Sequence, residues 1–281
     1  MSRSRKKRGQ RGAAKADRPG QGRAAAGAGR EEGGWAVSAV LPAYNEEAVL
    51  RSSTEELHEA LRRVCERFEI IIVDDGSTDA TPRIADELAE QYPEVRVIHH
   101  RPNRGYGAAL RSGFTSARMP LVFYTDADGQ FVPSEIRLLL ERIGEADIVT
   151  GYRADRQDPW LRKFFSWGFK KFIGLLFGVR VRDCDCAFKL YRRKVFGEIT
   201  IDSDMFFVDA EVLAKANVLG YRIVEVPVTH RPRAGGQSTV RLGHILTTLR
   251  EAWHVFRHPN LPRRKPKGAE KRRGQAGLPS P

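Results

Sequence analysis

Leu-Val-Phe-Tyr-Thr-Asp-Ala-Asp-Gly-Gln, residues 121–130, holds the strongest fold signal in this chain of 281 residues. Its first half is the β-rich run of a strand, and its second half is polar. Gly129 permits a turn that would bring the carboxylates of Asp126 and Asp128 together. Two carboxylates and the Gln130 amide suit a hard divalent cation, Mg²⁺ or Mn²⁺, which keeps waters and binds substrate phosphates. An Asx turn after the strand is the alternative interpretation.

Strand-like and helix-like segments alternate along the first half of the chain. The strands are expected at 36–41, 69–73, 95–99, 121–125 and 146–150, and the helices near 47–67, 79–92, 105–117 and 134–143. Regular alternation indicates right-handed βαβ units, and so an α/β fold with a mostly parallel sheet flanked by helices. Ligands of such sheets bind at the carboxyl ends of the strands.

Polar clusters follow four of these strands, at 42–46, 74–79, 103–107 and 126–130. One Asp-rich turn is usually a helix cap, but four clusters at successive strand ends would meet along one edge of the sheet. A dinucleotide-binding oxidoreductase fits poorly. Its first turn needs Gly-x-Gly-x-x-Gly, whereas the turn at 42–47 has no glycine.

The alternation ends after Gly151. An amphipathic run at 160–178 is followed by a short strand at 187–190, a helix near 208–219, a strand at 222–226 and a last helix near 241–256. In the amphipathic run, aromatic and leucine side chains share one helical arc, and cations lie mostly opposite. This pattern is typical of a helix lying in a membrane interface, and a helix buried under the sheet is the alternative.

The formal charge of +13 belongs to the two ends of the chain. Residues 1–34 carry ten Lys/Arg against three Asp/Glu, and 257–281 carry eight against one. We expect both to be disordered basic tails around a domain at 35–256, divided into 35–151 and 152–256. Such tails attract anionic membranes, and no specific nucleic-acid contact is expected. With no signal-peptide pattern and three cysteines, a cytoplasmic protein is expected.

Several motifs together resemble the inverting family 2 glycosyltransferases with a Rossmann-like GT-A fold. They are Leu-Pro-Ala-Tyr-Asn-Glu-Glu (41–47), Val-Asp-Asp-Gly-Ser-Thr-Asp (73–79), Asn-Arg-Gly-Tyr-Gly-Ala-Ala-Leu-Arg-Ser-Gly-Phe (103–114) and Asp-Ala-Asp-Gly-Gln (126–130). Three further pieces, at 150–153, 185–193 and 233–238, are similar to dolichol-phosphate mannosyltransferases and bacterial polyprenyl-phosphate glycosyltransferases. The likeness covers about 35–245.

This resemblance implies a donor site. Its residues would be Pro42, Tyr44, Glu46, Asp75, Asp126, Ala127, Asp128, Gln130, Lys189 and Arg233, of which Asp126, Asp128 and Gln130 would hold the metal and diphosphate. Asp128, Arg153 and Arg233 would be catalytic. The sequence departs from the family where a lysine often follows the serine of Arg-x-x-Gly-x-Ser, because Thr239 stands there. The resemblance therefore does not imply that Thr239 contacts a phosphate.

The acceptor half is basic, since residues 153–194 contain twelve Lys/Arg and four Asp. Arg162 and Ser166 share a helical face and could grip one phosphate. The resemblance adds Arg153 to this acceptor-phosphate set. A phosphomonoester is largely ionised at neutral pH, so such an acceptor needs no strong general base. A hydroxyl acceptor would need one, and the candidates are Asp183, Asp185, Asp209 and Glu211.

The expected function is inverting transfer of a hexose, mannose or glucose, from a GDP- or UDP-sugar to a polyprenyl phosphate of dolichyl or undecaprenyl type. The enzyme would act as a peripheral protein at the cytoplasmic, inner face of the cell membrane. Two alternatives stay open at this point: a glycosyltransferase for a hydroxyl acceptor in cell-wall or polysaccharide synthesis, and a catalytically silent membrane or nucleic-acid adaptor.

Overall fold

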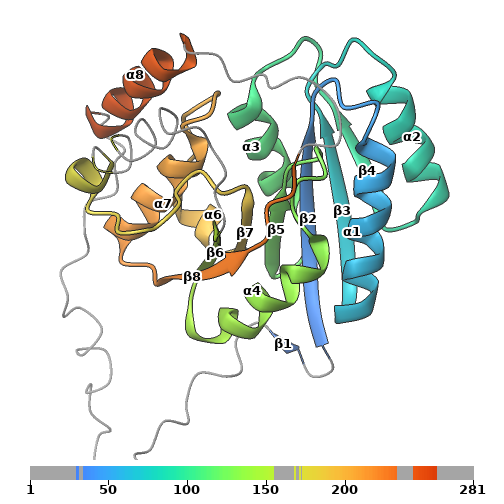
Figure 1. The fold of residues 1–281 in the computed structure, drawn as a ribbon, viewed down its shortest axis with the longest axis horizontal. Helices are drawn as coiled ribbons and strands as arrows, with labels where there is room; N and C mark the ends of the chain where they lie inside the picture. The colour runs from blue at the N-terminus through green and yellow to red at the C-terminus, as the bar shows by residue number, and fades with distance from the viewer. Residues whose placement is uncertain are drawn as a thin grey trace, which may run out of the picture.

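A computed structural model describes residues 30–31, 34–154, 168, 171, 173–232 and 243–257. At its centre lies one twisted sheet in the order β4-β3-β2-β5-β7-β6-β8, with β1 added on β2 (Figure 1). The strands are β1 (Arg30–Glu31), β2 (Gly34–Ala43), β3 (Cys65–Asp74), β4 (Val95–His99), β5 (Leu121–Thr125), β6 (Ile148–Arg153), β7 (Phe188–Arg192) and β8 (Ile223–Val228).

The sheet is mostly parallel, as the sequence predicts. β3 pairs parallel with β2 and β4, β5 with β2, and β8 with β6. β7 runs antiparallel between β5 and β6 and so joins the two halves of the chain into one sheet. β1 lies within the segment expected to be a disordered tail and pairs with the first residues of β2.

Helices connect the strands close to the expected places. They are α1 (Leu50–Val64), α2 (Thr81–Gln91), α3 (Tyr106–Ser116), α4 (Ile136–Arg142), α6 (Val195–Glu198), α7 (Val208–Leu219) and α8 (Gly243–Arg257), with short 3-10 turns at Pro133–Glu135 and Ile143–Glu145. The first helix is shorter than expected, because Cys65 and Arg67 already pair with β2 and their backbone bonds to the sheet end the helix.

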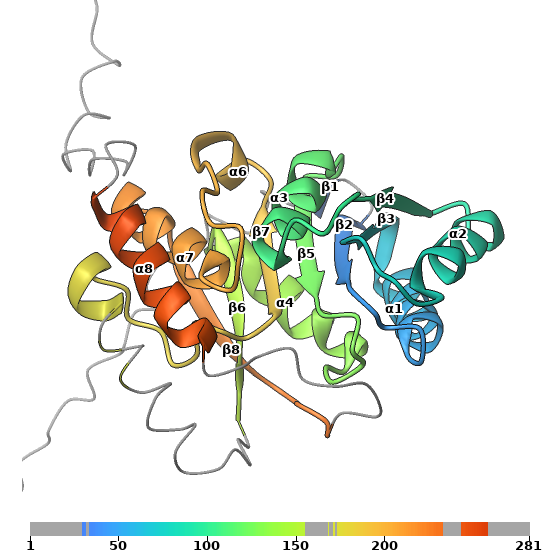
Figure 2. The ribbon, with the colours of Figure 1, turned by 90° about the horizontal axis from the view of Figure 1, so that it is seen from above.

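Two helical layers cover the sheet. α1 and α4 lie on one face and α3 and α7 on the other, as the view from above shows (Figure 2). Strand β3 is buried on both faces, and its run Ile70–Val73 is accordingly apolar without alternation. Leu50, Leu57 and Leu61 form the buried stripe of α1. This packing fixes where each strand ends, and the polar clusters follow those ends.

The amphipathic run at 160–178 lies largely outside the described residues. At its described end Ile173 and Phe177 are buried, whereas Leu175 is 86% exposed. This end therefore packs on the core through one side and leaves an apolar side chain on the other. In the part of the chain that the structure describes, no helix is long and apolar enough to cross a membrane.

Candidate active site

The carboxyl end of β5 places Asp126 and Asp128 at the sheet edge where β2 and β3 also end. Gly129 has a φ of 71°, in the left-handed region that favours glycine. Asp128 Oδ1 accepts the Gln130 backbone N–H at 3.0 Å, so the segment is an Asx turn. This bond involves Asp128 Oδ1. The Asx turn of the alternative interpretation is therefore present, and it holds Asp128 at the turn two residues after Asp126.

The electrostatics around Asp126 suit a divalent cation. Burial raises the pKa of Asp126 to about 7, and the charge of Asp128 adds to the rise. A cation would relieve the repulsion between these carboxylates, and their oxygens are hard ligands, so the two residues fit Mg²⁺ or Mn²⁺. No group of three His, Cys, Asp or Glu side chains within the described ranges could hold a metal ion. Any further ligands would come from Gln130, water or substrate oxygens.

The end of β2 and the loop after it carry three of the predicted donor residues. Pro42 is buried within the end of β2, whereas in the loop Tyr44 is 39% exposed and Glu46 is half-buried. The loop is held from the β3 side, because Glu46 N–H donates to Thr81 Oγ1 at 2.8 Å and Asn45 N–H donates to Ser77 Oγ at 3.0 Å. Tyr44 thus stands open at a rigid edge, which suits a stacking contact with a nucleoside base.

Asp75 occupies a different environment from the one expected of a nucleoside ligand. Its carboxylate is buried and accepts from His100 Nδ1 at 2.7 Å, Arg104 N–H at 3.0 Å and Gly105 N–H at 2.8 Å. These bonds fix the loop that begins α3. Contact between Asp75 and the base or ribose stays a prediction, and the observed bonds give the side chain a role in supporting the loop before α3.

Lys189 is also enclosed by protein. It is fully buried on β7, and its ammonium donates to Asp209 Oδ1 at 2.6 Å, Cys186 O at 2.6 Å and Tyr124 Oη at 3.0 Å. An ammonium has three N–H donors, and these partners use all of them. The predicted direct contact with donor phosphates does not fit this geometry, because the sheet brings Lys189 against α7 rather than to the open edge.

Arg153 ends β6 and is bound by a carboxylate from a distant segment. Its Nε donates to Asp183 Oδ2 at 2.7 Å and its Nη2 to Asp183 Oδ1 at 2.9 Å. This two-pronged pair raises the pKa of Arg153, so the guanidinium is always charged. The other acceptor residues predicted, Arg162 and Ser166, lie outside the described residues.

Arg233 also lies outside the described residues, but the chain leading to it is tied to the cation site. Arg231 N–H donates to Gln130 O at 2.6 Å, and Gln130 Nε2 donates to Arg231 O at 3.1 Å. This pair of bonds anchors the chain two residues before Arg233. The Gln130 amide, predicted as a metal ligand, uses its nitrogen here and keeps its carbonyl oxygen for another partner.

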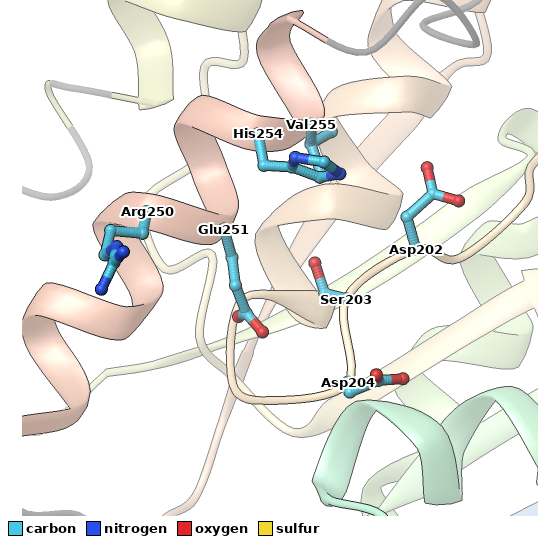
Figure 3. Close-up of a pocket in the computed structure, with 7 residues that line it drawn as sticks. All are labelled: Asp202, Ser203, Asp204, Arg250, Glu251, His254 and Val255. Atoms are coloured by element: carbon cyan, nitrogen blue, oxygen red, sulfur yellow. The ribbon is translucent and has the colours of Figure 1, made fainter.

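A pocket of about 340 Å³ lies between α8 and the loop that joins α6 to α7 (Figure 3). Its lining residues are Asp202, Ser203, Asp204, Arg250, Glu251, His254 and Val255. Asp204 O accepts Gly107 N–H at 2.8 Å, which links this loop to the start of α3. The loop therefore stands between α8 and the donor edge.

Residues 38–200 match the family described as Glycosyl transferase family 2. The chain belongs to glycosyl transferase family 2. The predicted family and its GT-A fold are thereby confirmed. A computed comparison of structures agrees: glucosyl-3-phosphoglycerate synthase from Mycobacterium tuberculosis, solved with Mn²⁺, UDP and phosphoglyceric acid, superposes with a TM-score of 0.59. That protein is 19% identical, and the match covers 78% of this chain and 76% of that one, so it shows the fold alone.

Several relatives of this chain carry the name of a polyprenyl-type phosphate. Polyprenol monophosphomannose synthase of Mycolicibacterium smegmatis is 32% identical over 73% of this chain and 81% of its own length. Glycosyltransferase AglD of Haloferax volcanii is 33% identical over 81% of this chain and 39% of its own length. Others, 33–35% identical, are named as acting with undecaprenyl, dodecaprenyl or dolichyl phosphate. The chain spans less than two thirds of the length of several of these relatives.

The sequence motifs did not single out one residue of this candidate site. Tyr106 lies inside the quoted motif at 103–114, and its hydroxyl donates to Asp126 Oδ1 at 2.8 Å. The available signal was a single aromatic residue between two glycines at a strand end. That pattern alone does not distinguish a site residue from a packing residue, because the partner lies 20 positions away.

Proposed function

We propose that this chain catalyses inverting transfer of a hexose, mannose or glucose, from a GDP- or UDP-sugar to a polyprenyl phosphate. The observation that carries the proposal is the acceptor shared by its relatives' names, since polyprenol, undecaprenyl, dodecaprenyl and dolichyl phosphates recur among them. The donor is supported by the geometry of the sheet edge, because Tyr44, Asp126 and Asp128 all follow the carboxyl ends of neighbouring parallel strands.

The donor diphosphate would bind with Mg²⁺ or Mn²⁺ at Asp126, Asp128 and Gln130. When bound, such a cation accepts negative charge as the nucleoside diphosphate leaves. The Mn²⁺ and UDP in the M. tuberculosis neighbour support this choice for the fold. The chain's own part is to hold two carboxylates close together on a turn and to keep water from the buried side of the site.

The acceptor half would supply Arg153, with Arg162 and Ser166 as further predicted contacts. An oxygen of the lipid phosphate attacks the anomeric carbon, the bond from that carbon to the donor diphosphate breaks, and the configuration inverts. The nucleophile is already an anion, so no proton has to be removed. Arg153 would hold that phosphate through the guanidinium edge that Asp183 does not occupy.

A hydroxyl acceptor would require a general base, and the environments of three of the four candidates do not favour that role. Asp183 is paired with Arg153, Asp209 with Lys189, and Glu211 with Lys215 at 2.6 Å. Glu211 is fully buried and also accepts two backbone N–H groups. Asp185 is the exposed member of the four. The ion-paired state of the other three suits structural roles and supports the phosphate acceptor.

Attachment to the inner membrane face would use an exposed apolar surface of α8, formed by Trp253 and Phe256, which we call the α8 patch. Their exposed fractions are 49% and 37%. Phe256 packs edge-on against the buried Phe177, at 5.8 Å between ring centroids, so α8 contacts the end of the amphipathic run. Arg257 lies over the Trp253 ring, at 5.5 Å from its centroid, which places a cation at the rim.

The test is a panel of radiolabelled GDP- and UDP-hexoses with undecaprenyl and dolichyl phosphate in detergent. We expect transfer from one donor, and at least a tenfold loss in Arg153→Lys, which keeps a charge beside Asp183 but lacks the guanidinium fork. Nucleoside diphosphate binding, followed by calorimetry, should stay unchanged. Arg137→Ala, an exposed arginine on α4, is the control. Transfer to a sugar hydroxyl instead of a lipid phosphate would contradict the proposal.

A further inference from the structure

Tyr106, the first residue of α3, reaches across the site to one of the proposed metal ligands. Its hydroxyl donates to Asp126 Oδ1 at 2.8 Å. Asp126 also stands beside Asp128, and two neighbouring carboxylates repel each other. A carboxylate in this position would rotate away from its neighbour unless another group held it. The Tyr106 hydroxyl is a neutral donor, so it can hold Asp126 without competing with a cation for the site's negative charge.

The Tyr106 ring is fixed by an aromatic contact. It stacks on Phe206, with 5.7 Å between ring centroids and 27° between ring planes. The glycines on either side of Tyr106 let the backbone come close to the same loop. A Cβ on Gly105 would lie 2.3 Å from Asp204 O, and a Cβ on Gly107 would lie 2.3 Å from Ser203 O. This close approach needs glycine at both positions, which explains the Gly-Tyr-Gly sequence.

The loop beneath Tyr106 is itself held by buried charge. Glu211 accepts Asp202 N–H at 2.8 Å and Ser203 N–H at 2.9 Å, and Lys215 pairs with Glu211 at 2.6 Å. On the other side of the loop, Arg111 Nη2 of α3 donates to Asp204 Oδ1 at 2.7 Å. A buried ion pair that also accepts two backbone N–H groups favours one geometry of the loop. The loop beneath the Tyr106 ring is therefore held in place, as the support of a residue that orients a metal ligand must be.

We propose that Tyr106 is a positioning residue that orients Asp126 toward the divalent cation and so sets the affinity for metal with nucleoside diphosphate. The inference rests on the proposed function, because it assigns a task within that metal site. The hydroxyl engages Oδ1 and leaves Oδ2 to serve the cation. Groups that hold a metal ligand in place from behind typically change metal affinity by about ten- to a hundredfold when removed.

The experiment compares the full chain with Tyr106→Phe, which keeps the ring on Phe206 and removes only the hydroxyl. Binding of Mn²⁺ is followed by electron paramagnetic resonance at saturating UDP, and in parallel GDP. We expect a weakening of Mn²⁺ binding by about tenfold or more. Binding of UDP and GDP in excess chelator, and the melting temperature, should stay as in the parent chain. In turnover assays, raising Mn²⁺ should restore kcat.

Two further variants separate orientation from packing. Tyr191→Phe removes a hydroxyl from another buried tyrosine, away from the site, and should leave Mn²⁺ binding unchanged. Phe206→Leu keeps the Tyr106 hydroxyl but removes the ring stack, and should weaken Mn²⁺ binding less than Tyr106→Phe does. Equal Mn²⁺ affinity in Tyr106→Phe and the parent chain would overturn the positioning role while leaving the proposed function intact. No metal-dependent binding of either nucleotide by the parent chain would overturn the proposed function and this inference with it.

Discussion

At the scale of single residues, the electrostatics of the site depend on two neighbouring carboxylates at the sheet edge. Asp126 and Asp128 stand together, and burial and mutual repulsion raise the pKa of Asp126 to about 7. The folded chain therefore binds a proton at Asp126 that the unfolded chain, with an ordinary carboxyl pKa, has already released at neutral pH. Asp126 is thus a source of instability that a bound cation would remove.

This imbalance predicts a pH-dependent effect of Asp126→Asn in the absence of metal. A raised carboxyl pKa gives stability that is full below about pH 4 and lost as the pH rises toward 7. The variant should therefore be as stable as the parent chain at pH 4 and more stable by about 1–3 kcal/mol at pH 8, the full pKa shift being reduced by partial exposure. Urea unfolding in chelator measures this difference. A variant that is less stable than the parent at pH 8 would contradict the assignment.

Asp128 leads to a second prediction, on activity. Asp128→Ala should abolish transfer, by at least a hundredfold, because it removes both a cation ligand and the Asx turn at Gln130. Excess chelator should do the same to the parent chain. Asp86→Ala, which removes an exposed carboxylate from α2, is the control. Full turnover of the parent chain in chelator would remove the metal from the mechanism.

Lys189 gives a prediction about stability rather than chemistry. Removing one partner of a buried ion pair leaves the other charge unpaired, so Lys189→Met should cost about 3–5 kcal/mol in urea unfolding. Lys194→Met is a matched control, because Lys194 pairs with Asp147 at 2.7 Å but is 61% exposed, and its loss should cost under about 1 kcal/mol. Equal costs for the two variants would show that the buried pair is not what holds β7 against α7.

At the scale of elements, α8 has two unlike faces. Ala252 and Val255 are buried against the core, and Trp253 and Phe256 are exposed. An aromatic face with a cation at its rim is the pattern of a helix that lies in a membrane interface. In the structure Phe256 packs against the buried Phe177, so the last helix is held against the end of the amphipathic run. Neither segment alone predicts this contact.

The α8 patch predicts that Trp253→Ser and Phe256→Ser each weaken binding to liposomes by about tenfold, since each removes roughly 1–2 kcal/mol of apolar burial. Co-sedimentation with vesicles measures the change, and turnover on a detergent-dissolved acceptor should persist. Tyr44→Ser, at another exposed aromatic residue, is the control for liposome binding. Loss of binding in the control to the same extent would mean that the patch is not specific.

At the scale of the whole molecule, charge is divided between the ends and the domain. Residues 1–29 carry nine Lys/Arg and one Asp, and they precede β1, so their deletion leaves the sheet intact. Each of these cations that reaches an anionic membrane contributes about 1 kcal/mol to the free energy of binding, and this contribution falls as the salt concentration rises.

We therefore expect deletion of 1–29 to reduce binding to anionic vesicles strongly at low salt and little at high salt. Turnover of a short-chain polyprenyl phosphate in detergent should remain within about twofold of the full chain, because the segment lies outside the proposed donor and acceptor residues. Deletion that destroys turnover in detergent would place the segment within the site.

The sequence by itself determined the α/β class, the family and the sheet edge that carries the site, because strand–helix alternation and polar strand ends are local patterns. It also placed Asp126 and Asp128 together, since only one turn separates them. Only the tertiary structure decided the hydrogen-bond partners of the predicted site residues and of Tyr106. Lys189 donates to Asp209, Asp75 accepts from His100, and Tyr106 donates to Asp126. These partners lie 20 or more positions apart along the chain, and their contacts depend on how sheet and helices pack, which no local spacing encodes.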